Sequence, residues 1–407
     1  MRLLDERLGV FEGSFEAGAA RVVCGGWGVA RPHVASVLEE LQTRGRVTLV
    51  AHARPARWRL NGPRGNPSDS LGRRHAAYYD GFCRRARPHF SGRHQQRWLD
   101  RFEHEVPNLR QAIRWSLEHG EADWALGISV ASFALWFKRD MATEGLEWTT
   151  RSLDAFGDAP DPLRLDGLNA AGMLHTAVGS SSEGRRVLLL ALELAWALGE
   201  PAAEAAVLSN LGITFRDEGD LDEARKSLSG AIALWRQLGQ DGRLANSLVN
   251  LSAVLIAQNR EREAAPLLAE AETMYNQLDD PWSRAMVGFT LADLAMRNGE
   301  MARARAELAE SIRTFKHLKD HRGLAVCFKL LSGLEATIGR YRRAAILFGA
   351  AESARSAAQV QIAAIELAPL MQTVEEVREI LGEEQYDDAW THGNELALAD
   401  AVAFALE

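Results

Sequence analysis

Residues 208–219 read LSNLGITFRDEG, and residues 288–299 read GFTLADLAMRNG. In each stretch a leucine is followed at once by a small residue, and a glycine ends the stretch eight positions after that leucine. The three positions are Leu211, Gly212 and Gly219 in the first stretch, and the second stretch has leucine, alanine and glycine there. The same spacing recurs every forty residues, five times within residues 168–367. A fixed period of this length indicates stacked copies of one supersecondary unit.

The five copies agree at each characteristic position. The bulky position holds Ala171, Leu211, Leu251, Leu291 and Leu331, and the small position holds Gly172, Gly212, Ser252, Ala292 and Ser332. The helix-ending position holds Gly179, Gly219, Asn259, Gly299 and Gly339. Further along come Gly184, Ala224, Ala264, Ala304 and Ala344, and then Leu188, Leu228, Leu268, Leu308 and Phe348. These agreements predict a pair of helices in every copy.

The spacing has a direct physical meaning. A bulky residue beside a small one lets the first helix approach its partner closely, and Gly or Asn adopts the left-handed turn that ends that helix. Each hairpin leaves an apolar flank that only the next hairpin covers, so the copies must stack into a solenoid. The pattern resembles the tetratricopeptide repeat (TPR), in a forty-residue form with an extended second helix. We therefore expect an all-α fold, a right-handed TPR superhelix over residues 168–367.

The sequence on either side of the repeats predicts a small N-terminal domain, a linker and further helices. Residues 1–60 predict two helices (15–23 and 32–43) and an antiparallel pair of strands (47–51 and 57–60), the layout of a winged-helix-like domain. Residues 61–70 are rich in Gly, Pro, Asn and Ser and predict a linker. Residues 71–167 predict helices in degenerate TPR-like hairpins, and residues 368–407 predict capping helices that cover the open end of the solenoid.

Composition limits where the protein works and what it binds. No apolar run approaches the ~20 residues that cross a bilayer, and the three scattered cysteines form no metal or disulfide spacing, so we expect a cytoplasmic protein and no membrane partner. Residues 1–100 carry 17 Arg and 9 Asp plus Glu, a net charge of +8, whereas the whole chain carries −8. The basic N-terminal region could bind DNA, or it could be an ordinary solvated surface.

Several stretches outside the repeat pattern are similar to one family. Residues 7–24, 73–79, 105–115, 345–352 and 390–404 resemble the winged-helix and TPR half of bacterial STAND ATPases, the LuxR-related ATP-binding transcriptional regulators. The resemblance implies a role in bacterial transcriptional or signalling control. The phosphate-binding loop of that family, which ends in Gly-Lys-Ser or Gly-Lys-Thr, does not occur in this sequence. The chain therefore resembles a regulator without its ATPase domain, either as a segment of a longer protein or through domain loss, and ATP hydrolysis is not expected.

No arrangement of residues predicts catalysis, so we expect a protein that is not an enzyme. His89, His94 and His104 lie in one region, but their spacing does not place them on one helical face as metal ligands. We therefore predict no metal and no cofactor. A small-molecule binding or unconventional enzymatic role within the solenoid groove remains an alternative.

The inner groove of the predicted superhelix is the candidate binding site. In the TPR fold the first helix of each hairpin lines this groove, and counting from the bulky position selects the candidate residues. They are Asn169, Met173, Ser209, Asn210, Ile213, Arg216, Asn250, Ile256, Phe289, Asp293, Met296 and Lys329. Asn210, Asn250, Lys329 and Arg216 match by type the clamp with which TPR proteins hold a peptide carboxylate, although two repeats lack the matching residue.

The apolar members suit an adaptable apolar or amphipathic ligand. The expected partner is a peptide, a protein or a small effector, DNA is the less favoured alternative, and homo-oligomers remain open. This interpretation requires that the chain itself does not fill the groove.

Overall fold

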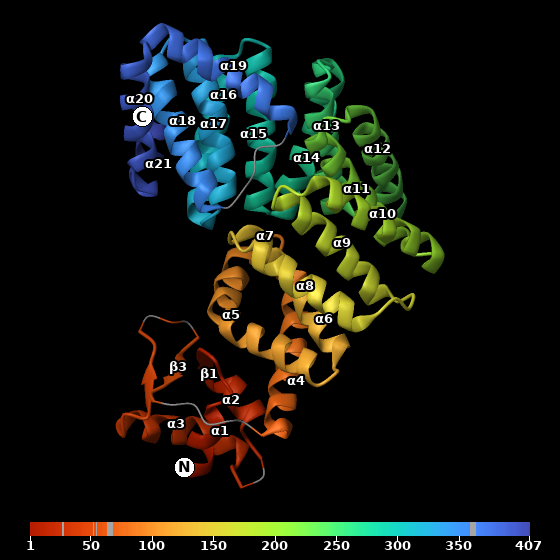
Figure 1. Ribbon diagram of the computed structural model, residues 1–407, viewed down its shortest axis with the longest axis vertical. Helices are drawn as coiled ribbons and strands as arrows, with labels where there is room; N and C mark the ends of the chain where they lie inside the picture. The colour runs from red at the N-terminus through yellow and green to blue at the C-terminus, as the bar shows by residue number, and fades with distance from the viewer. Residues whose placement is uncertain (27, 52, 54, 63–67, 359–363) are drawn as a thin grey trace. The chain divides into compact units, whose positions relative to one another are not determined.

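The computed structural model describes residues 1–407 except 27, 52, 54, 63–67 and 359–363 (Figure 1). The described residues divide into two compact units. The first unit contains residues 1–90, 94–135 and 147–159, and the second contains residues 91–93, 136–146 and 160–407. Residues 136–146 thus belong to the second unit, whereas the residues on both sides of them in sequence belong to the first.

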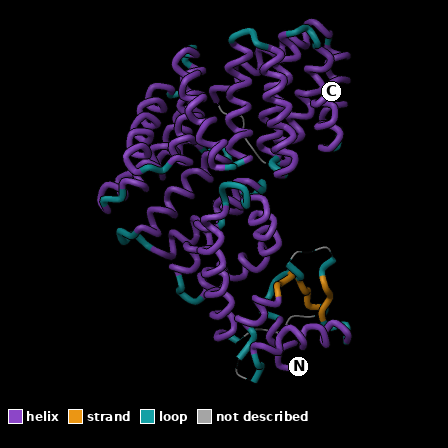
Figure 2. Tube along the Cα trace, turned by 180° about the vertical axis from the view of Figure 1, so that it is seen from behind, coloured by secondary structure: helices purple, strands orange, loops and turns teal. Residues whose placement is uncertain are grey.

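The first unit begins with a small mixed domain that holds all the strands of the described residues (Figure 2). Its elements are α1 (Arg2–Leu8), β1 (Ser14–Glu16), α2 (Ala17–Val23), η1 (Arg31–His33), α3 (Val34–Thr43), β2 (Val47–Leu49) and β3 (Arg57–Leu60). The sheet is antiparallel in the order β1-β3-β2, with Trp58 of β3 opposite both Phe15 and Leu49. The predicted helices and strand pair are present, whereas α1 and β1 were not expected.

The remainder of the first unit is helical. It draws on α4 (Asp69–Ala86), η2 (Arg87–His89), α5 (Gln95–Glu118), α6 (Ala122–Ala131), α7 (Phe133–Lys138) and α8 (Ala142–Phe156), of which residues 136–146 belong to the second unit. Helices α4 and α5 cross closely, because a Cβ on Gly72 would collide with the indole of Trp115. Half of the predicted 61–70 linker, residues 63–67, lies outside the described residues, and α4 begins inside the predicted range.

The second unit is built from five consecutive hairpins whose helices lie side by side (Figure 1). The first helices are α9 (Pro162–Ala177), α11 (Pro201–Glu218), α13 (Asp241–Ala257), α15 (Pro281–Arg297) and α17 (His321–Thr337). The second helices are α10 (Ser181–Leu198), α12 (Leu221–Leu238), α14 (Glu261–Leu278), α16 (Met301–Leu318) and α18 (Tyr341–Ala357). Each helix packs against the next, so one apolar core cluster extends from α11 to α15 and another continues from α15 to α18. The predicted all-α stack of hairpins is confirmed.

The turn inside every hairpin has the left-handed backbone that the repeat pattern requires. The φ angle is 85° at Gly179, 90° at Gly219, 56° at Asn259, 78° at Gly299 and 81° at Gly339. Asn is among the few non-glycine residues that adopt this conformation readily, which explains the one exception.

In the two copies that have glycine at the small position, the second helix leaves no room for a side chain. A Cβ on Gly172 would collide with Leu188, and one on Gly212 with Leu228. The alanines Ala224, Ala264, Ala304 and Ala344 are fully buried at the crossing of the two helices. The close approach predicted from the pairing of bulky and small residues is therefore observed.

Three helices follow the hairpins, α19 (Ala364–Leu381), α20 (Glu383–Glu395) and α21 (Leu398–Leu406). The backbones of α20 and α18 are in close contact at two glycines. A Cβ on Gly349 would collide with the carbonyl oxygen of Trp390, and a Cβ on Gly393 would collide with the carbonyl oxygen of Ile346. Helix α21 packs on α16 and α18. Helix α19 contacts α18 and α20 but also reaches α17 and α11.

Candidate functional site

The candidate site is the face of the first helices that is turned away from the second helices, which we call the inner face. Most of the residues predicted for the groove lie half-buried on α9, α11, α13, α15 and α17. They are Asn169, Asn210, Ile213, Arg216, Asn250, Phe289, Asp293, Met296 and Lys329.

Three predicted groove residues are instead buried between helices. Met173 and Ser209 are each 7% exposed and Ile256 is 1% exposed, so no partner reaches their side chains in this arrangement. Ser209 Oγ lies 2.8 Å from Ser247 Oγ on the next first helix, within the packing between hairpins. Successive residues of a helix point in directions about 100° apart. The repeat pattern therefore predicts which side chains lie in the centre of the buried face, but it does not predict which side chains at the border of that face are accessible.

Asparagines form the most regular polar feature of the inner face. Asn210 Nδ2 donates to Asn169 Oδ1 at 2.7 Å, which joins α11 to α9. Asn250 Nδ2 donates to the carbonyl of Asn246 at 3.0 Å within α13. A primary amide has two donor hydrogens and an acceptor oxygen, so these half-buried side chains retain capacity to bond a peptide main chain.

Of the four residues that match a carboxylate clamp by type, three bond neighbouring side chains of the same chain. Arg216 forms an ion pair with its neighbour Asp217 at 2.7 Å, and Asn210 and Asn250 bond other asparagines. Apolar contacts are concentrated at α15, where Phe289 and Met296 are partly buried against the core cluster of α15 to α18.

One end of the inner face carries a segment of the same chain, residues 136–140, which sequence reasoning missed. Lys138 Nζ lies 4.0 Å from the ring centroid of Trp282, at the start of α15. The guanidinium of Arg322, at the start of α17, lies 4.6 Å from the ring centroid of Phe137. Arg139 Nη1 donates to the carbonyl of Leu318 at 2.6 Å.

The same segment ends in a histidine contact. Asp140 Oδ2 lies 2.8 Å from Nδ1 of His321 in α17, and Asp140 has a left-handed φ of 56°. That hydrogen bond and the charge of Asp140 raise the pKa of His321. A non-glycine residue in this conformation is held by its surroundings, so the Asp140–His321 contact fixes the end of the segment.

Two aspartates shape the place where Lys138 lies. Asp280 and Asp320 are 5% and 4% exposed and cap α15 and α17 through the N–H groups of Ser283 and Gly323. Trp282 Nε1 donates to Asp320 Oδ2 at 2.6 Å, which orients the indole. Burial lowers the pKa of Lys138 to about 8, and the charges of Asp280 and Asp320 oppose that shift. We call Asp280, Trp282 and Asp320 the acidic receptor.

Helix α19 restricts the inner face further, because it contacts α11 and α17, which are both first helices. The chain itself therefore covers part of the groove that was expected to be free for a partner. The asparagines and the apolar residues of α15 remain half-buried, whereas the receptor end is occupied.

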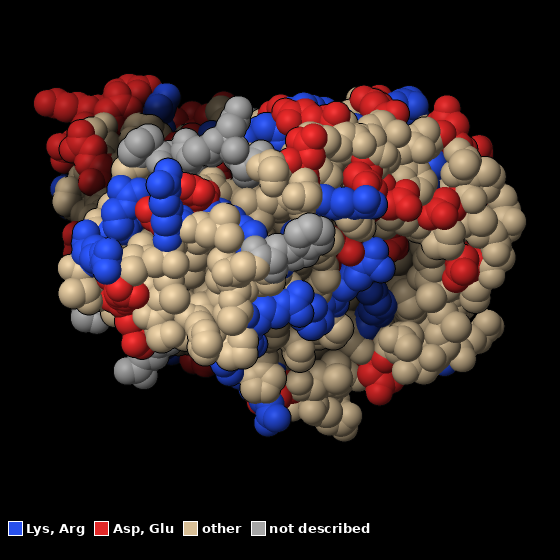
Figure 3. Space-filling model, turned by 90° about the horizontal axis from the view of Figure 1, so that it is seen from below, with Lys and Arg blue, Asp and Glu red and all other residues tan. Residues whose placement is uncertain are grey.

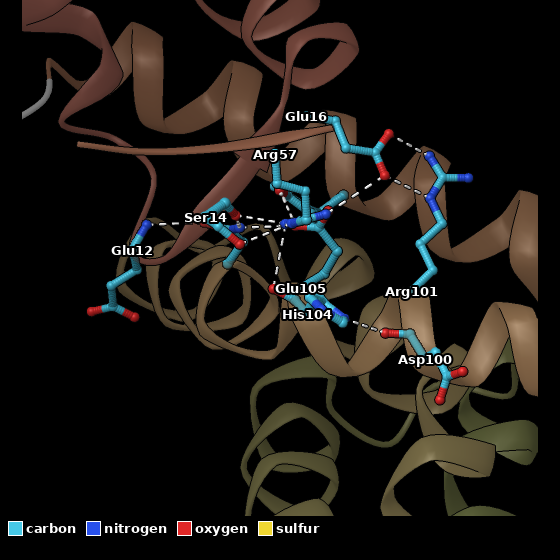
Figure 4. Close-up of polar contacts among 10 residues, drawn as sticks. Glu12, Ser14, Glu16, Arg57, Asp100, Arg101, His104 and Glu105 are labelled. Atoms are coloured by element: carbon cyan, nitrogen blue, oxygen red, sulfur yellow. Dashed lines mark hydrogen bonds and ion pairs between the residues drawn. The ribbon is translucent and has the colours of Figure 1, made fainter. Parts of the chain in front are cut away.

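A buried polar network joins β1 and β3 to α4 and α5 within the first unit (Figure 4). Arg57 Nη1 donates to Glu105 Oε1 at 2.6 Å and Arg57 Nε to Ser14 Oγ at 2.8 Å, while Tyr79 donates to Glu105 Oε2 at 2.7 Å. Burial raises the pKa of Tyr79 well above its usual value, and the negative charge of Glu105 raises it further.

No substrate reaches these groups, since the Arg57 and Glu105 side chains are each 3% exposed. Ser14 lies in β1, and α2 begins at Ala17, two residues after the start of the predicted helix 15–23.

Carboxylates lie among the basic side chains on the described surface of the small mixed domain. Helix α3 exposes Glu39 and Glu40, and Arg44 and Arg46 form ion pairs with Glu40 and Asp5. On the face drawn in Figure 3, Lys and Arg side chains form separate groups with Asp and Glu between them. Carboxylates on the helix would repel DNA phosphates.

The histidine-rich stretch has structural contacts. His89 stacks on Trp98 with ring centroids 4.9 Å apart, and His104 Nδ1 lies 2.6 Å from the carbonyl of Asp100. Within the described residues, no group of three His, Cys, Asp or Glu side chains is placed to hold a metal ion. A search of the same residues finds no helix with the length and apolarity to span a membrane.

Comparison with known proteins agrees with the geometry of the hairpins. Residues 203–277 match the family model described as tetratricopeptide repeat. The fold is an all-α TPR superhelix. The structure of a Rap protein in complex with Competence and Sporulation Factor superposes with a TM-score of 0.53 at 11% identity, over 81% of this chain and 97% of that one.

Two further matches are one curated protein and one solved structure. "Putative HTH-type transcriptional regulator Rv0890c" of Mycobacterium tuberculosis is 24% identical over 297 residues, 70% of this chain. This chain spans only 30% of the length of that relative. A STAND protein with a TPR sensor, PH0952 of Pyrococcus horikoshii, covers 99% of this chain and 64% of its own at 12% identity, with a TM-score of 0.46.

Proposed function

We propose that this protein is a non-enzymatic recognition module of a bacterial transcriptional or signalling regulator, and that its TPR inner face binds a peptide or a segment of a partner protein. The observation that carries the proposal is the row of half-buried asparagines beside apolar side chains on successive first helices. Amide side chains bond an extended main chain, and Ile213, Phe289 and Met296 supply adaptable apolar contacts.

The relatives support the same class of function. The Rap protein of similar fold is described in complex with Competence and Sporulation Factor, and the mycobacterial relative is named as a transcriptional regulator. The order of elements in residues 1–60 supports a winged-helix-like domain that makes internal contacts in such a regulator. Three buried free cysteines and the regulator-like relatives support a cytoplasmic location.

The test begins with a random peptide library selected on the full chain, followed by affinity measurements on the selected peptides. We expect Asn210→Ala and Asn250→Ala to weaken binding about fivefold to tenfold each, since a lost hydrogen bond is worth about 1 kcal/mol. Gln237→Ala is the matched control, because Gln237 is an exposed amide on the second helix α12.

Selected peptides that bind wild type and both asparagine variants equally, or that lose affinity with Gln237→Ala instead, would refute the assignment of the inner face. Failure to select any peptide from a folded chain would remove the peptide-binding function itself.

A further inference from the structure

The acidic receptor shows what kind of side chain this end of the inner face accepts. An indole face attracts a cation, most strongly when both are removed from water, and Lys138 Nζ lies 4.0 Å from the Trp282 centroid. The carboxylates of Asp280 and Asp320 are almost fully buried and bring two negative charges to the same place. A cation therefore matches both the ring and the charge of the receptor.

The neighbouring contacts add an aromatic requirement. Phe137 lies beneath the guanidinium of Arg322, which also donates to the carbonyl of Ala177 at the end of α9 at 3.4 Å. The adjacent residues Phe137 and Lys138 thus contact α17 and α15, two successive first helices. The occupying segment consequently has a defined chemistry, an aromatic residue followed directly by a cationic one.

The side chains of residues 137–140 contact the ends of helices. Their partners are Trp282, Leu318, His321 and Arg322, all at the beginning of α15, at the end of α16 or at the beginning of α17. No strand pairing holds the segment among the described residues. A peptide with the same side chains could reproduce every one of these contacts.

We propose that the acidic receptor recognises partner segments in which an aromatic residue precedes a cationic one, and that residues 136–140 of this chain are an internal competitor for that site. The proposal rests on the proposed function and specifies the partner of the same inner face. A partner binds fully only after it displaces Phe137 and Lys138. The segment sets a threshold for partners, because a competitor within the same chain acts at an effective concentration of about a millimolar.

The experiment uses the full chain and a labelled peptide with the sequence of residues 135–141, LWFKRDM, measured by fluorescence anisotropy. The double variant Phe137→Ala with Lys138→Gln removes the competitor, and Asp140→Asn weakens the contact that holds its end while it leaves His321 and the acidic receptor intact. We expect both variants to bind the peptide more tightly than wild type, the double variant by about tenfold or more. Thermal unfolding checks that each variant is folded.

Two controls identify the receptor. The peptide LWFEEDM should not bind, since its carboxylates would face Asp280 and Asp320, and Trp282→Ala added to the double variant should abolish the gain. Equal affinity of wild type and both folded variants would overturn the proposal, as would binding of the acidic peptide. If the double variant does not fold, Asp140→Asn alone decides. Library peptides that depend on Asn210 would keep the proposed function intact even if this peptide never binds.

Discussion

At the scale of single residues, the small position of the repeat allows a direct test of the helix packing. A Cβ at Gly212 would collide with Leu228, whereas a Cβ at Gly230 would meet only Leu208 Cδ1 at 3.4 Å. We expect Gly212→Ala to destabilise the protein by about 1–3 kcal/mol through overpacking. Gly230→Ala in the facing helix should instead stabilise it by about 0.5–1 kcal/mol through helix propensity. Urea unfolding compares the two, and equal effects would contradict the packing argument.

The buried ion pair of the first unit makes a second prediction for single residues. Glu105→Gln removes the nearer charged partner of the buried Arg57 guanidinium and leaves Glu16 at 3.5 Å, and we expect a loss of up to about 3 kcal/mol in stability. The control is Glu40→Gln, which breaks the exposed pair with Arg44 and should cost about 0–1 kcal/mol. Denaturant melts followed by circular dichroism measure both, and a mild effect of Glu105→Gln would show that the network is not a structural anchor.

Residue types could be predicted from the sequence where backbone geometry demanded them. The left-handed turns at Gly219 and Asn259 and the contact at Gly212 follow from the repeat pattern. The residues that each first helix exposes on the inner face could not be predicted, because they depend on the rotation between neighbouring hairpins. Ser209 and Ile256 consequently lie in the packing between helices although they were predicted to face the groove.

At the scale of elements, the Asp140–His321 contact predicts a pH dependence. The pKa of His321 is raised, so this contact stabilises the fold fully below about pH 6.5, the unperturbed value, and its contribution is lost as pH rises through the raised pKa. Asp320 acts in the same direction as Asp140, while burial and Arg139 oppose them.

We expect the unfolding free energy of wild type to fall by no more than about 1 kcal/mol across that range, because the pair is partly exposed. His321→Gln should remove this part of the pH dependence, and Asp140→Asn should do so while preserving the left-handed turn. Urea titrations at several pH values measure it. Identical pH profiles for wild type and His321→Gln would contradict the assigned role of this contact.

Some helices and strands could be predicted from the sequence, and others could not. Helices 15–23 and 32–43, the strand pair and all ten hairpin helices follow from local periodicity, whereas β1 is a three-residue strand that exists because it pairs with β3. The docking of Lys138 on Trp282 and the reach of α19 to α11 join residues that are far apart in sequence. A single sequence carries no signal for such contacts.

At the scale of the whole molecule, the charge asymmetry alone does not predict DNA binding. The excess of Arg in residues 1–100 is partly neutralised by ion pairs, and α3 exposes carboxylates. We expect no gel shift of a random-sequence duplex near physiological salt, and any binding at low salt should weaken steeply as salt increases. A sequence-specific complex that survives physiological salt would contradict this expectation and favour the DNA-binding alternative.

The central claim is that the inner face of the TPR superhelix performs recognition. Hydrogen–deuterium exchange on the full chain, with and without a library-selected peptide, tests it most directly. The account predicts added protection on the first helices α11, α13, α15 and α17 and changed exchange in residues 136–140, with the second helices α10 and α12 unaffected. Protection confined to the second helices or to residues 1–60 would contradict it.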